Sequence, residues 1–271
     1  MSHISHWELS NWNTCPFYHK LMHIDKLSAF KDNEYFAFGR AVHNTCERLF
    51  EDRKHSLTSD DESAERLYPK QTPEFFEEDF LKELKEAKKT KNPLDKELVF
   101  SLREQGKKVV PLVMEATVEQ FGEFEIISAE EKLFEPIHDL DFPYDFKGRL
   151  DLVLKTSDGK YHIIDWKTCS WGWDARKKSD RMTTYQLTYY KHYFAQKHNI
   201  DPEDIETYFA LIKRTAKQNN VEFVRITSGE KKTENAIGFL TNALWNVKNK
   251  NYIKNKLSCG RCDFSKTKHC P

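Results

Sequence analysis

Two aspartates and a lysine lie on either side of a short turn between two apolar segments. The first segment contains the motif GRLD, whose last residue is Asp151. The second segment contains Asp165 and Lys167. Side chains alternate along a strand, so Asp165 and Lys167 share one face and Trp166 points to the other. A three-residue turn with a left-handed Gly159 places Asp151 opposite Asp165, whereas a two-residue turn places it opposite Trp166. If the three polar groups act together, we therefore expect the odd-length turn or an equivalent bulge.

Such a group has a defined chemistry. Two carboxylates side by side repel each other, and a divalent cation between them removes that repulsion. Mg²⁺ and Mn²⁺ prefer hard oxygen ligands, which Asp151, Asp165 and the backbone carbonyl of Trp166 could supply. Lys167 would then lie beside a metal-bound water, which it could orient or deprotonate, while the metal stabilises charge on a phosphate. The alternative interpretation is a hairpin that carries ordinary surface carboxylates and a lysine.

Hydrophobic periodicity predicts the elements that position these residues. The helices are expected at 7–27 (interrupted at Cys15-Pro16), 36–53, 183–198 and 230–250, and the strands at 126–134, 146–154, 161–167, 207–213 and 221–226. Residues 54–115, rich in acidic runs and punctuated by proline, are expected to be a helical insertion. This order predicts an α/β fold with a mixed central sheet flanked by helices.

Composition narrows the class of protein. Lys and Arg together number 43, as do Asp and Glu, so the net charge is zero and basic residues must be concentrated locally if the chain binds nucleic acid. No apolar run approaches the roughly 20 residues that span a bilayer, and the N-terminus lacks the features of a signal peptide. We therefore expect a cytoplasmic protein, or one of the host cytoplasm if the source is viral, with no membrane partner.

The segment that follows Lys167 is rich in indoles and cations. It contains Trp171, Trp173, Arg176, Lys177, Lys178 and Arg181. Aromatic rings stack on bases and cations pair with phosphates, so this composition suits a single strand of nucleic acid. The alternative, a solvated loop with its tryptophans in the core, has equal weight.

Four short motifs, in order along the chain, resemble those of the RecB-like branch of the PD-(D/E)XK nucleases, which includes recombination and CRISPR-adaptation exonucleases. They are the G-x-x-x-H of Gly39 to His43, the G-x-x-D of Gly148 to Asp151, the D-x-K of Asp165 to Lys167, and the Q-x-x-x-Y of Gln186 to Tyr190. The resemblance implies a restriction-endonuclease-like core. It also implies that His43 binds metal, that Asp151 and Asp165 hold it, and that Lys167 is catalytic. Gln186 and Tyr190, four residues apart on one helix face, would point at the site or the DNA strand. Ordinary helix packing is the alternative for those two.

The cysteines extend this resemblance. Some RecB-like nucleases hold a [4Fe–4S] cluster with one N-terminal and three C-terminal cysteines, and the same arrangement here is Cys15 with Cys259, Cys262 and Cys270. Four thiolates suit iron–sulfur or zinc. Seven residues separate the last two cysteines, which departs from the usual spacing of five, so His269 could replace Cys270. A tail with unbound thiols is the alternative.

Together these features predict one nuclease domain over 1–271, with a helical insertion at about 54–115 and a cysteine-rich tail at 257–271. The expected activity is that of a Mg²⁺- or Mn²⁺-dependent DNA exonuclease or end-processing nuclease that favours single strands, with a helicase or recombination protein as a partner. The alternatives are a structure-specific endonuclease and a non-catalytic nucleic-acid-binding module. The intact Asp151, Asp165 and Lys167 set argues against the last.

Overall fold

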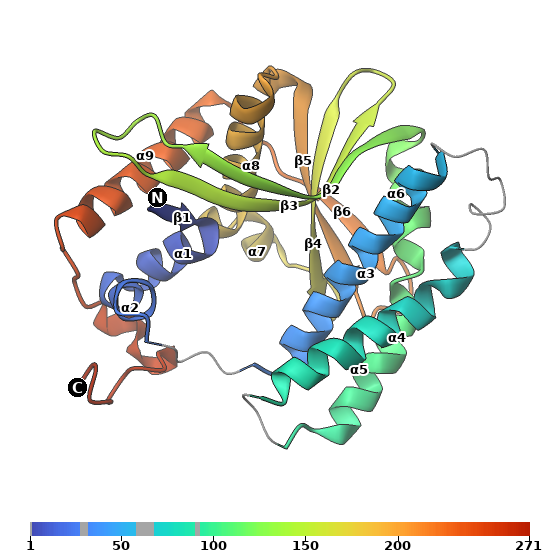
Figure 1. The fold of residues 1–271 in the computed structure, drawn as a ribbon, viewed down its shortest axis with the longest axis horizontal. Helices are drawn as coiled ribbons and strands as arrows, with labels where there is room; N and C mark the ends of the chain where they lie inside the picture. The colour runs from blue at the N-terminus through green and yellow to red at the C-terminus, as the bar shows by residue number, and fades with distance from the viewer. Residues whose placement is uncertain (1, 28–31, 58–67, 90–92) are drawn as a thin grey trace.

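The computed structural model describes residues 2–27, 32–57, 68–89 and 93–271, and its elements surround a mixed sheet (Figure 1). In the described residues the sheet has six strands in the order β1-β3-β4-β5-β6, with β2 paired to the other edge of β3. The strands are β1 (His3–Ser5), β2 (Phe124–Pro136), β3 (Asp145–Thr156), β4 (Tyr161–Cys169), β5 (Ile205–Lys213) and β6 (Val221–Arg225). The predicted α/β fold with a mixed sheet is confirmed. The sequence did not predict the short β1, which pairs in parallel with the start of β3.

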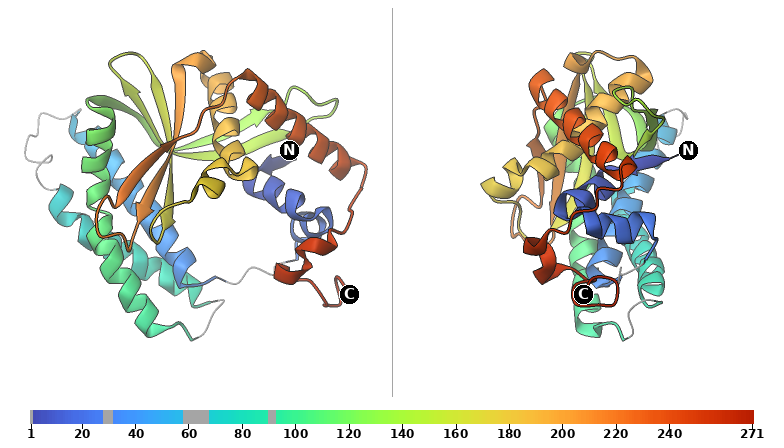
Figure 2. Two further views of the ribbon diagram at one scale, coloured as in Figure 1. Left: turned by 180° about the vertical axis from the view of Figure 1, so that it is seen from behind. Right: turned by 90° about the vertical axis from the view of Figure 1, so that its left-hand side faces the viewer.

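The helices cover both faces of this sheet (Figures 1 and 2). One face carries α3 (Glu34–Leu57), α4 (Tyr68–Ala87), α5 (Lys96–Val109) and α6 (Leu112–Phe121), and the other carries α8 (Arg181–His198) and α9 (Glu230–Lys248). Trp166 and Ile164 of β4 are buried under the first group, whereas Ile163 is buried under the second, as strand alternation requires. Within the described residues, no helix is long and apolar enough to cross a membrane.

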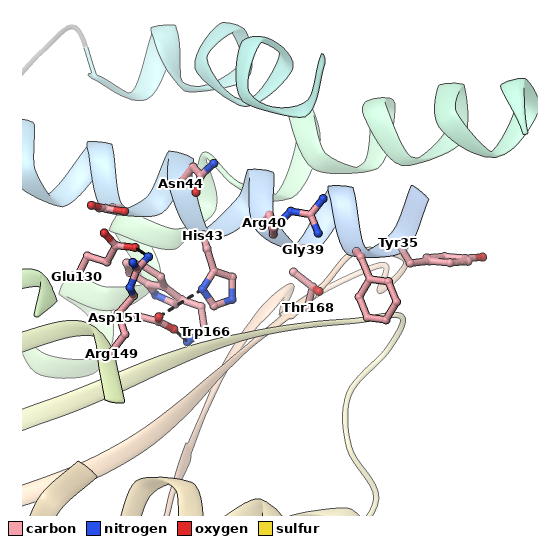
Figure 3. A pocket seen from close by; sticks show the side chains of 12 residues that line it. Tyr35, Gly39, Arg40, His43, Asn44, Glu130, Arg149, Asp151, Trp166 and Thr168 are labelled. Atoms are coloured by element: carbon pink, nitrogen blue, oxygen red, sulfur yellow. Dashed lines mark hydrogen bonds and ion pairs between the residues drawn. The ribbon is translucent and has the colours of Figure 1, made fainter. Parts of the chain in front are cut away.

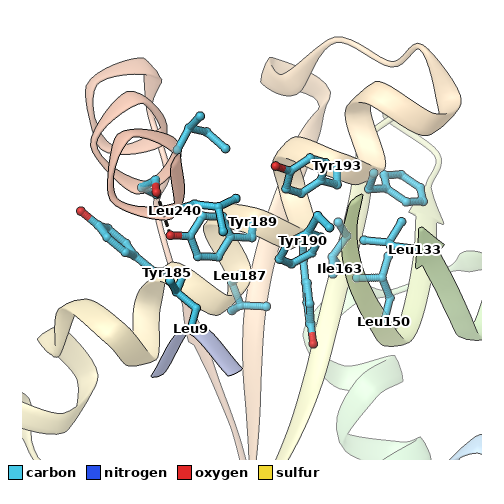
Figure 4. Close-up of a cluster of buried hydrophobic side chains, with 14 of the residues drawn as sticks. Leu9, Leu133, Leu150, Ile163, Tyr185, Leu187, Tyr189, Tyr190, Tyr193 and Leu240 are labelled. Carbon is cyan, nitrogen blue, oxygen red and sulfur yellow. Dashed lines mark hydrogen bonds between the residues drawn. The ribbon is translucent and has the colours of Figure 1, made fainter. Parts of the chain in front are cut away.

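The core beneath α8 and α9 is unusually aromatic (Figure 4). Tyr189 and Tyr193 are fully buried, and Tyr193 stacks on Phe146 of β3 with 4.3 Å between ring centroids. The Tyr189 hydroxyl donates to the Ala236 carbonyl of α9 at 2.7 Å, so its polar atom is satisfied inside the core. Tyr190 differs, because its hydroxyl points out of the cluster toward the polar groups described below.

The segment expected to be an insertion is helical, and it packs into the hydrophobic core between α3 and the sheet. The α3 helix continues to Leu57, so the helices of this segment begin at Tyr68 rather than at 54. Phe76 and Phe80 of α4 are buried against Phe38 of α3, with ring centroids 5.6 and 6.1 Å from it. These helices therefore hold α3 against the sheet. The apolar residues that recur along α3 therefore pack against α4 as well as against the strands.

The N-terminal helices lie beside the C-terminal tail (Figure 1). The predicted interruption at Cys15-Pro16 is confirmed: α1 (His6–Thr14) ends at an extended Cys15, Pro16 starts α2 (Pro16–His19), and a π-helical turn η1 (Lys20–Ile24) follows. The chain after α9 returns to this region, where the Phe17 N–H donates to the Ile253 carbonyl at 3.3 Å. A short 3₁₀ helix, η4 (Lys256–Arg261), then leads into the tail.

Candidate active site

The β3–β4 hairpin has the odd-length turn that the site requires. The Thr156 N–H donates to the Lys160 carbonyl at 3.0 Å, which leaves three turn residues, and Gly159 has a φ of +87°. The ladder runs from Lys155 opposite Tyr161 to Leu152 opposite Ile164. The next pair in this register is Asp151 with Asp165, so the predicted three-residue turn is confirmed.

The two strands separate at that pair. Beyond Leu152 and Ile164, β4 continues beside β5, while the other end of β3 lies beside β1 and β2. This fork leaves the Trp166 N–H without a strand partner on β3, and the Asp151 side chain accepts it through Oδ2 at 2.8 Å. Asp151 and Asp165 therefore stand at the base of an opening in the sheet, both almost fully buried.

The α3 helix brings His43 to this fork (Figure 3). Its Nδ1 lies 3.3 Å from Asp151 Oδ1, so the two oxygens of Asp151 have different partners. The imidazole stands edge-on to the Trp166 ring, with 6.1 Å between centroids. Trp166 itself is buried and stacks on Phe50 of α3, which fixes the helix that carries His43 against β4.

The α8 helix approaches the same fork from the opposite side. Gln186 Nε2 donates to Asp165 Oδ1 at 2.7 Å and to the Tyr190 hydroxyl at 3.1 Å. The other oxygen, Asp165 Oδ2, lies 2.6 Å from Lys167 Nζ but receives no hydrogen bond of good geometry from the described residues. The structure thus brings together His43, Asp151, Asp165, Lys167, Gln186 and Tyr190, which come from four separate elements.

Burial and charge separate the two carboxyls. Burial raises the pKa of Asp165 to about 6, and the repulsion of Asp151 adds to that shift, although Lys167 opposes it. Burial also acts to raise the pKa of Asp151. The positive charges of His43 and Lys167 and the hydrogen bond from the Trp166 N–H act in the opposite direction and outweigh burial, so this pKa is lowered. Burial opposes the charged form of His43, yet Asp151 raises the pKa of its imidazole. Of the two carboxyls, Asp165 is thus the one whose charge is less well compensated.

The donor set fits a hard divalent cation. Two carboxylates and an imidazole meet at the fork, and the buried Asp165 Oδ2 has an ammonium contact but no satisfactory hydrogen bond. In the described residues, no three His, Cys, Asp or Glu side chains are already arranged around a metal position, because these groups are turned toward internal partners. A bound cation would therefore replace the His43–Asp151 and Lys167–Asp165 contacts.

A pocket of about 420 Å³ opens from the fork between α3 and the sheet (Figure 3). Besides His43 and Asp151 it is lined by Glu47, Glu130 and Arg149, none of which the sequence singled out as a site residue. Glu47 lies one helical turn after His43, a spacing that could have revealed it. Arg149 lies two residues before Asp151 and forms an ion pair with Glu130. Glu130 has a φ of +53°, a backbone conformation that nothing in the sequence predicts.

The loop after Lys167 is only partly available to a ligand. Trp171 is 79% exposed. Trp173 packs on Phe209 with 5.1 Å between centroids and carries Lys177 over its ring, so it belongs to the core edge. Lys178 forms an ion pair with Glu222 at 2.6 Å.

At the end of that loop, Arg181 covers the Phe239 ring, 4.9 Å from its centroid, while Arg176 is exposed on α7 (Ala175–Ser179). The expected contact of this loop with a nucleic-acid strand therefore stays a prediction. Trp171 and Arg176 face solvent, Trp173 packs on the core edge, and the exposed Arg181 lies over the Phe239 ring.

The structure brings two of the four predicted cluster cysteines to one residue. Cys15 Sγ accepts the Asn255 N–H at 3.3 Å, and Cys259 Sγ contacts the Asn255 carbonyl at 3.9 Å. Cys262 ends η4, and Cys270 lies in the following turns. In the described residues, which include all four cysteines, the thiols are free and no metal-ligating group of three is formed.

Comparisons with known proteins place this geometry in a family. A sequence model of the PD-(D/E)XK nuclease superfamily matches residues 3–269. The fold is similar to that of a candidate exonuclease from Eubacterium rectale, with a TM-score of 0.54, 12% identity, and coverage of 94% of this chain and 85% of that one. A more distant similarity is to the crystal structure of SSO0001, with a TM-score of 0.38, 13% identity, and coverage of 96% and 92%. No curated protein sequence matches significantly. With its sheet, its forked hairpin and a family match over nearly all of its length, the chain belongs to the PD-(D/E)XK nuclease superfamily.

Proposed function

We propose that the chain is a metal-dependent DNA exonuclease or end-processing nuclease of the RecB-like branch, and that it favours single-stranded DNA. The observation that carries this proposal is the convergence of Asp151, Asp165 and Lys167 at the fork, with His43 on one side and Gln186 on the other. A protein that only bound DNA would not need two buried carboxylates beside a lysine, because uncompensated buried charge costs stability.

In this proposal Asp151, Asp165, His43 and the Trp166 carbonyl hold Mg²⁺ or Mn²⁺. The bound cation would supply Lewis-acid stabilisation of the phosphate charge and lower the pKa of a coordinated water. The chain's own groups do the rest. Gln186 fixes the orientation of Asp165 through Oδ1, and Tyr190 fixes Gln186. Both therefore act as positioning residues that keep the second carboxylate aimed at the fork.

Lys167 has the geometry of a group that orients the attacking water. Its side chain is 29% exposed, and its ammonium reaches the buried Asp165 from the open side of the fork. Hydrolysis breaks one P–O bond of the phosphodiester, and the oxygen of the attacking water forms the new one. Lys167 would hold that water by donating a hydrogen bond to it, and its charge would also attract the phosphate.

A direct test compares two lysines of the same hairpin. Lys167→Ala should lower the rate of DNA cleavage by about 10²–10⁴, as the loss of one transition-state group typically does. Lys160→Ala is the control, because Lys160 also pairs with an aspartate, Asp204 at 2.9 Å, but lies at the turn. Near-normal cleavage by purified Lys167→Ala would refute the assignment. Closed single-stranded circles compared with the same strand made linear test the end requirement, and equal rates would favour the endonuclease alternative.

We also propose that Cys15, Cys259, Cys262 and Cys270 bind a [4Fe–4S] cluster, with zinc as the alternative. The shared contact of Cys15 and Cys259 with Asn255 supports this, because it joins the two ends of the chain at the cysteines. Anaerobically purified protein should contain iron and absorb near ~400 nm. Zinc alone would retain the metal-bound tail and exclude the cluster. The absence of both metals, with unchanged stability of Cys15→Ser, would exclude a metal site.

A further inference from the structure

A second pocket, of about 720 Å³, lies beside the catalytic fork and extends away from the site described above. It runs between α1 and the paired ends of β2 and β3, and it reaches Gln186 and Tyr190 on α8. We call it the ribbon groove, after the two-stranded β2–β3 ribbon that forms one wall. Figure 1 shows this ribbon extending from the centre of the sheet over α1.

Two large aromatic side chains are exposed in the ribbon groove. Trp7 of α1 is 57% exposed, and Phe134 of β2 is 48% exposed. Each ring rests against one histidine: Trp7 stands edge-on to His23 at 4.9 Å, and Phe134 is tilted against His3 at 5.8 Å. Neither ring belongs to a buried core, so both retain apolar area that a flat ligand could cover.

Cations line the same wall. Phe134 is paired with Lys147 across the ribbon and Lys132 with Arg149, so these four side chains share one face of β2 and β3. Within the described part of the chain, the ammonium groups of Lys132 and Lys147 have no ion pair or hydrogen bond. Because the whole chain has a net charge of zero, this wall is a local concentration of positive charge.

The opposite wall adds one more cation and one acid. Lys26, at the end of the N-terminal helices, also lines the groove. The carboxylate of Glu8 faces it as well, but His19 holds Glu8 at 2.8 Å and His23 lies 4.0 Å from it. This wall therefore adds no net charge, and the basic character of the groove comes from Lys132, Lys147 and Arg149 of the ribbon.

The ribbon groove is continuous with the catalytic fork. Arg149 lines both this groove and the pocket that contains Asp151. Gln186 lines the groove and donates to Asp165. Along β3, Lys147 precedes Asp151 by four residues, which corresponds to about 13 Å of extended strand. A chain that lay on the ribbon would thus lead directly to the carboxylates.

We propose that the ribbon groove binds the stretch of single-stranded DNA next to the bond that is cut, with bases stacked on Trp7 and Phe134 and phosphates at Lys132, Lys147 and Arg149. This inference rests on the proposed nuclease function. Exposed rings alternating with cations match the bases and phosphates of an unpaired strand, whose base faces are free to stack. In a duplex those faces are hidden, so the aromatic pair gives a preference for single strands.

The test measures binding apart from cleavage. A labelled single strand of about 12 nucleotides, within the range of known single-strand sites, and the matching duplex are titrated by fluorescence anisotropy in the presence of chelator. Trp7→Ala/Phe134→Ala should weaken single-strand binding about 25-fold or more, because each stacked base contributes about fivefold or more. Duplex binding should change by less than about threefold. The control is Phe100→Ala/Trp245→Ala, which removes a phenylalanine 63% exposed and a tryptophan 54% exposed on other surfaces.

The contribution of the groove lysines is tested by the salt dependence of binding. Lys132→Gln/Lys147→Gln should lower the slope of log affinity against log salt by about 1.4, or about 0.7 for each lost phosphate contact. The exposed lysines of α4, Lys82 and Lys85, provide the matched control pair, which should leave the slope unchanged. Thermal unfolding of each variant shows that it is folded.

The outcomes separate this inference from the proposed function. If the wild type binds and cuts single strands but Trp7→Ala/Phe134→Ala binds them as tightly, the groove assignment is wrong and the nuclease stands. An equal loss of single-strand and duplex binding would also overturn it, because stacking cannot explain that result. If the wild type cuts no DNA with Mg²⁺ or Mn²⁺, the proposed function fails, while the anisotropy titration still reports on the groove.

Discussion

The two aspartates at the fork should have opposite effects on the stability of the metal-free protein. Asp165 is buried, and its pKa of about 6 lies about 2 units above that of an exposed aspartate. Each unit corresponds to about 1.36 kcal/mol, so its charge destabilises the fold by about 3 kcal/mol at neutral pH. Asp165→Asn removes that charge and retains an oxygen that can accept from Gln186. We expect this variant to unfold at a temperature higher by about 5 °C or more in chelator at pH 7.5.

The pH dependence follows from the direction of the shift. Because the folded-state pKa of Asp165 is raised, the folded protein binds more protons than the unfolded chain between about pH 4 and pH 6. The wild type should lose stability as pH rises through this window, and the loss should be complete above it. The stability gap between Asp165→Asn and the wild type should therefore be small near pH 4 and constant above about pH 7.

Asp151→Asn is the matched control at the same fork. Its charge is stabilised by His43, Lys167 and the Trp166 N–H, and its pKa is lowered. The contribution of Asp151 is present above the unfolded-state pKa and lost as pH falls through the folded-state value. We expect Asp151→Asn to be less stable than the wild type at pH 7.5 by about 1–3 kcal/mol, the range for a hydrogen bond to a charged group.

Differential scanning fluorimetry, with and without saturating Mn²⁺, checks both signs. Mn²⁺ should raise the unfolding temperature of the wild type and have little effect on Asp165→Asn, because a ligand stabilises only the state that binds it. Both variants should be inactive as nucleases. If metal-free Asp165→Asn is no more stable than the wild type at pH 7.5, the buried charge of Asp165 is not destabilising, and this account of the fork is wrong.

Two further predictions concern packing around the site. Gly106→Ala should destabilise the fold by about 1–3 kcal/mol or more in chemical denaturation, since a Cβ at this position would lie 2.0 Å from the buried Phe76 ring. A change in the free energy of unfolding below about 0.5 kcal/mol would show that α4 and α5 separate easily. Trp173→Ala should cost about 2 kcal/mol because the indole packs on Phe209, whereas Trp171→Ala should leave the unfolding midpoint unchanged; equal midpoints for the two variants would contradict the difference in packing.

Local rules were sufficient to predict the hairpin and the faces of its residues. The turn at Gly159 correctly fixes the register of the ladder that leads to Asp151 and Asp165, and strand alternation correctly turns Trp166 to the other face. Helical spacing likewise places Gln186 and Tyr190 together, and they are hydrogen-bonded. These predictions succeed because each depends on residues that are close in sequence or on one regular backbone geometry.

Contacts between distant segments could not be predicted in the same way. The sequence gives no sign that Lys178 is neutralised by Glu222 or that β1 pairs with β3, because both depend on how loops and ends are placed by tertiary packing. The ribbon groove could not be predicted for the same reason, because it also depends on tertiary packing. Its walls come from α1 and from β2, which are more than a hundred residues apart, and neither Trp7 nor Phe134 belongs to a recognisable motif.

The fork explains why this hairpin can be both rigid and reactive. A strand pair that remained closed would use its backbone groups in the ladder and hold both carboxylates against a neighbouring strand. Here the ladder is intact up to Leu152 and Ile164, which fixes the next pair in register, and it opens at Asp151 and Asp165. The open backbone needs a partner, and Asp151 supplies one to the Trp166 N–H. Asp151 therefore stabilises the open end of the ladder, while the buried Asp165, whose pKa is raised, carries the charge that a cation would neutralise.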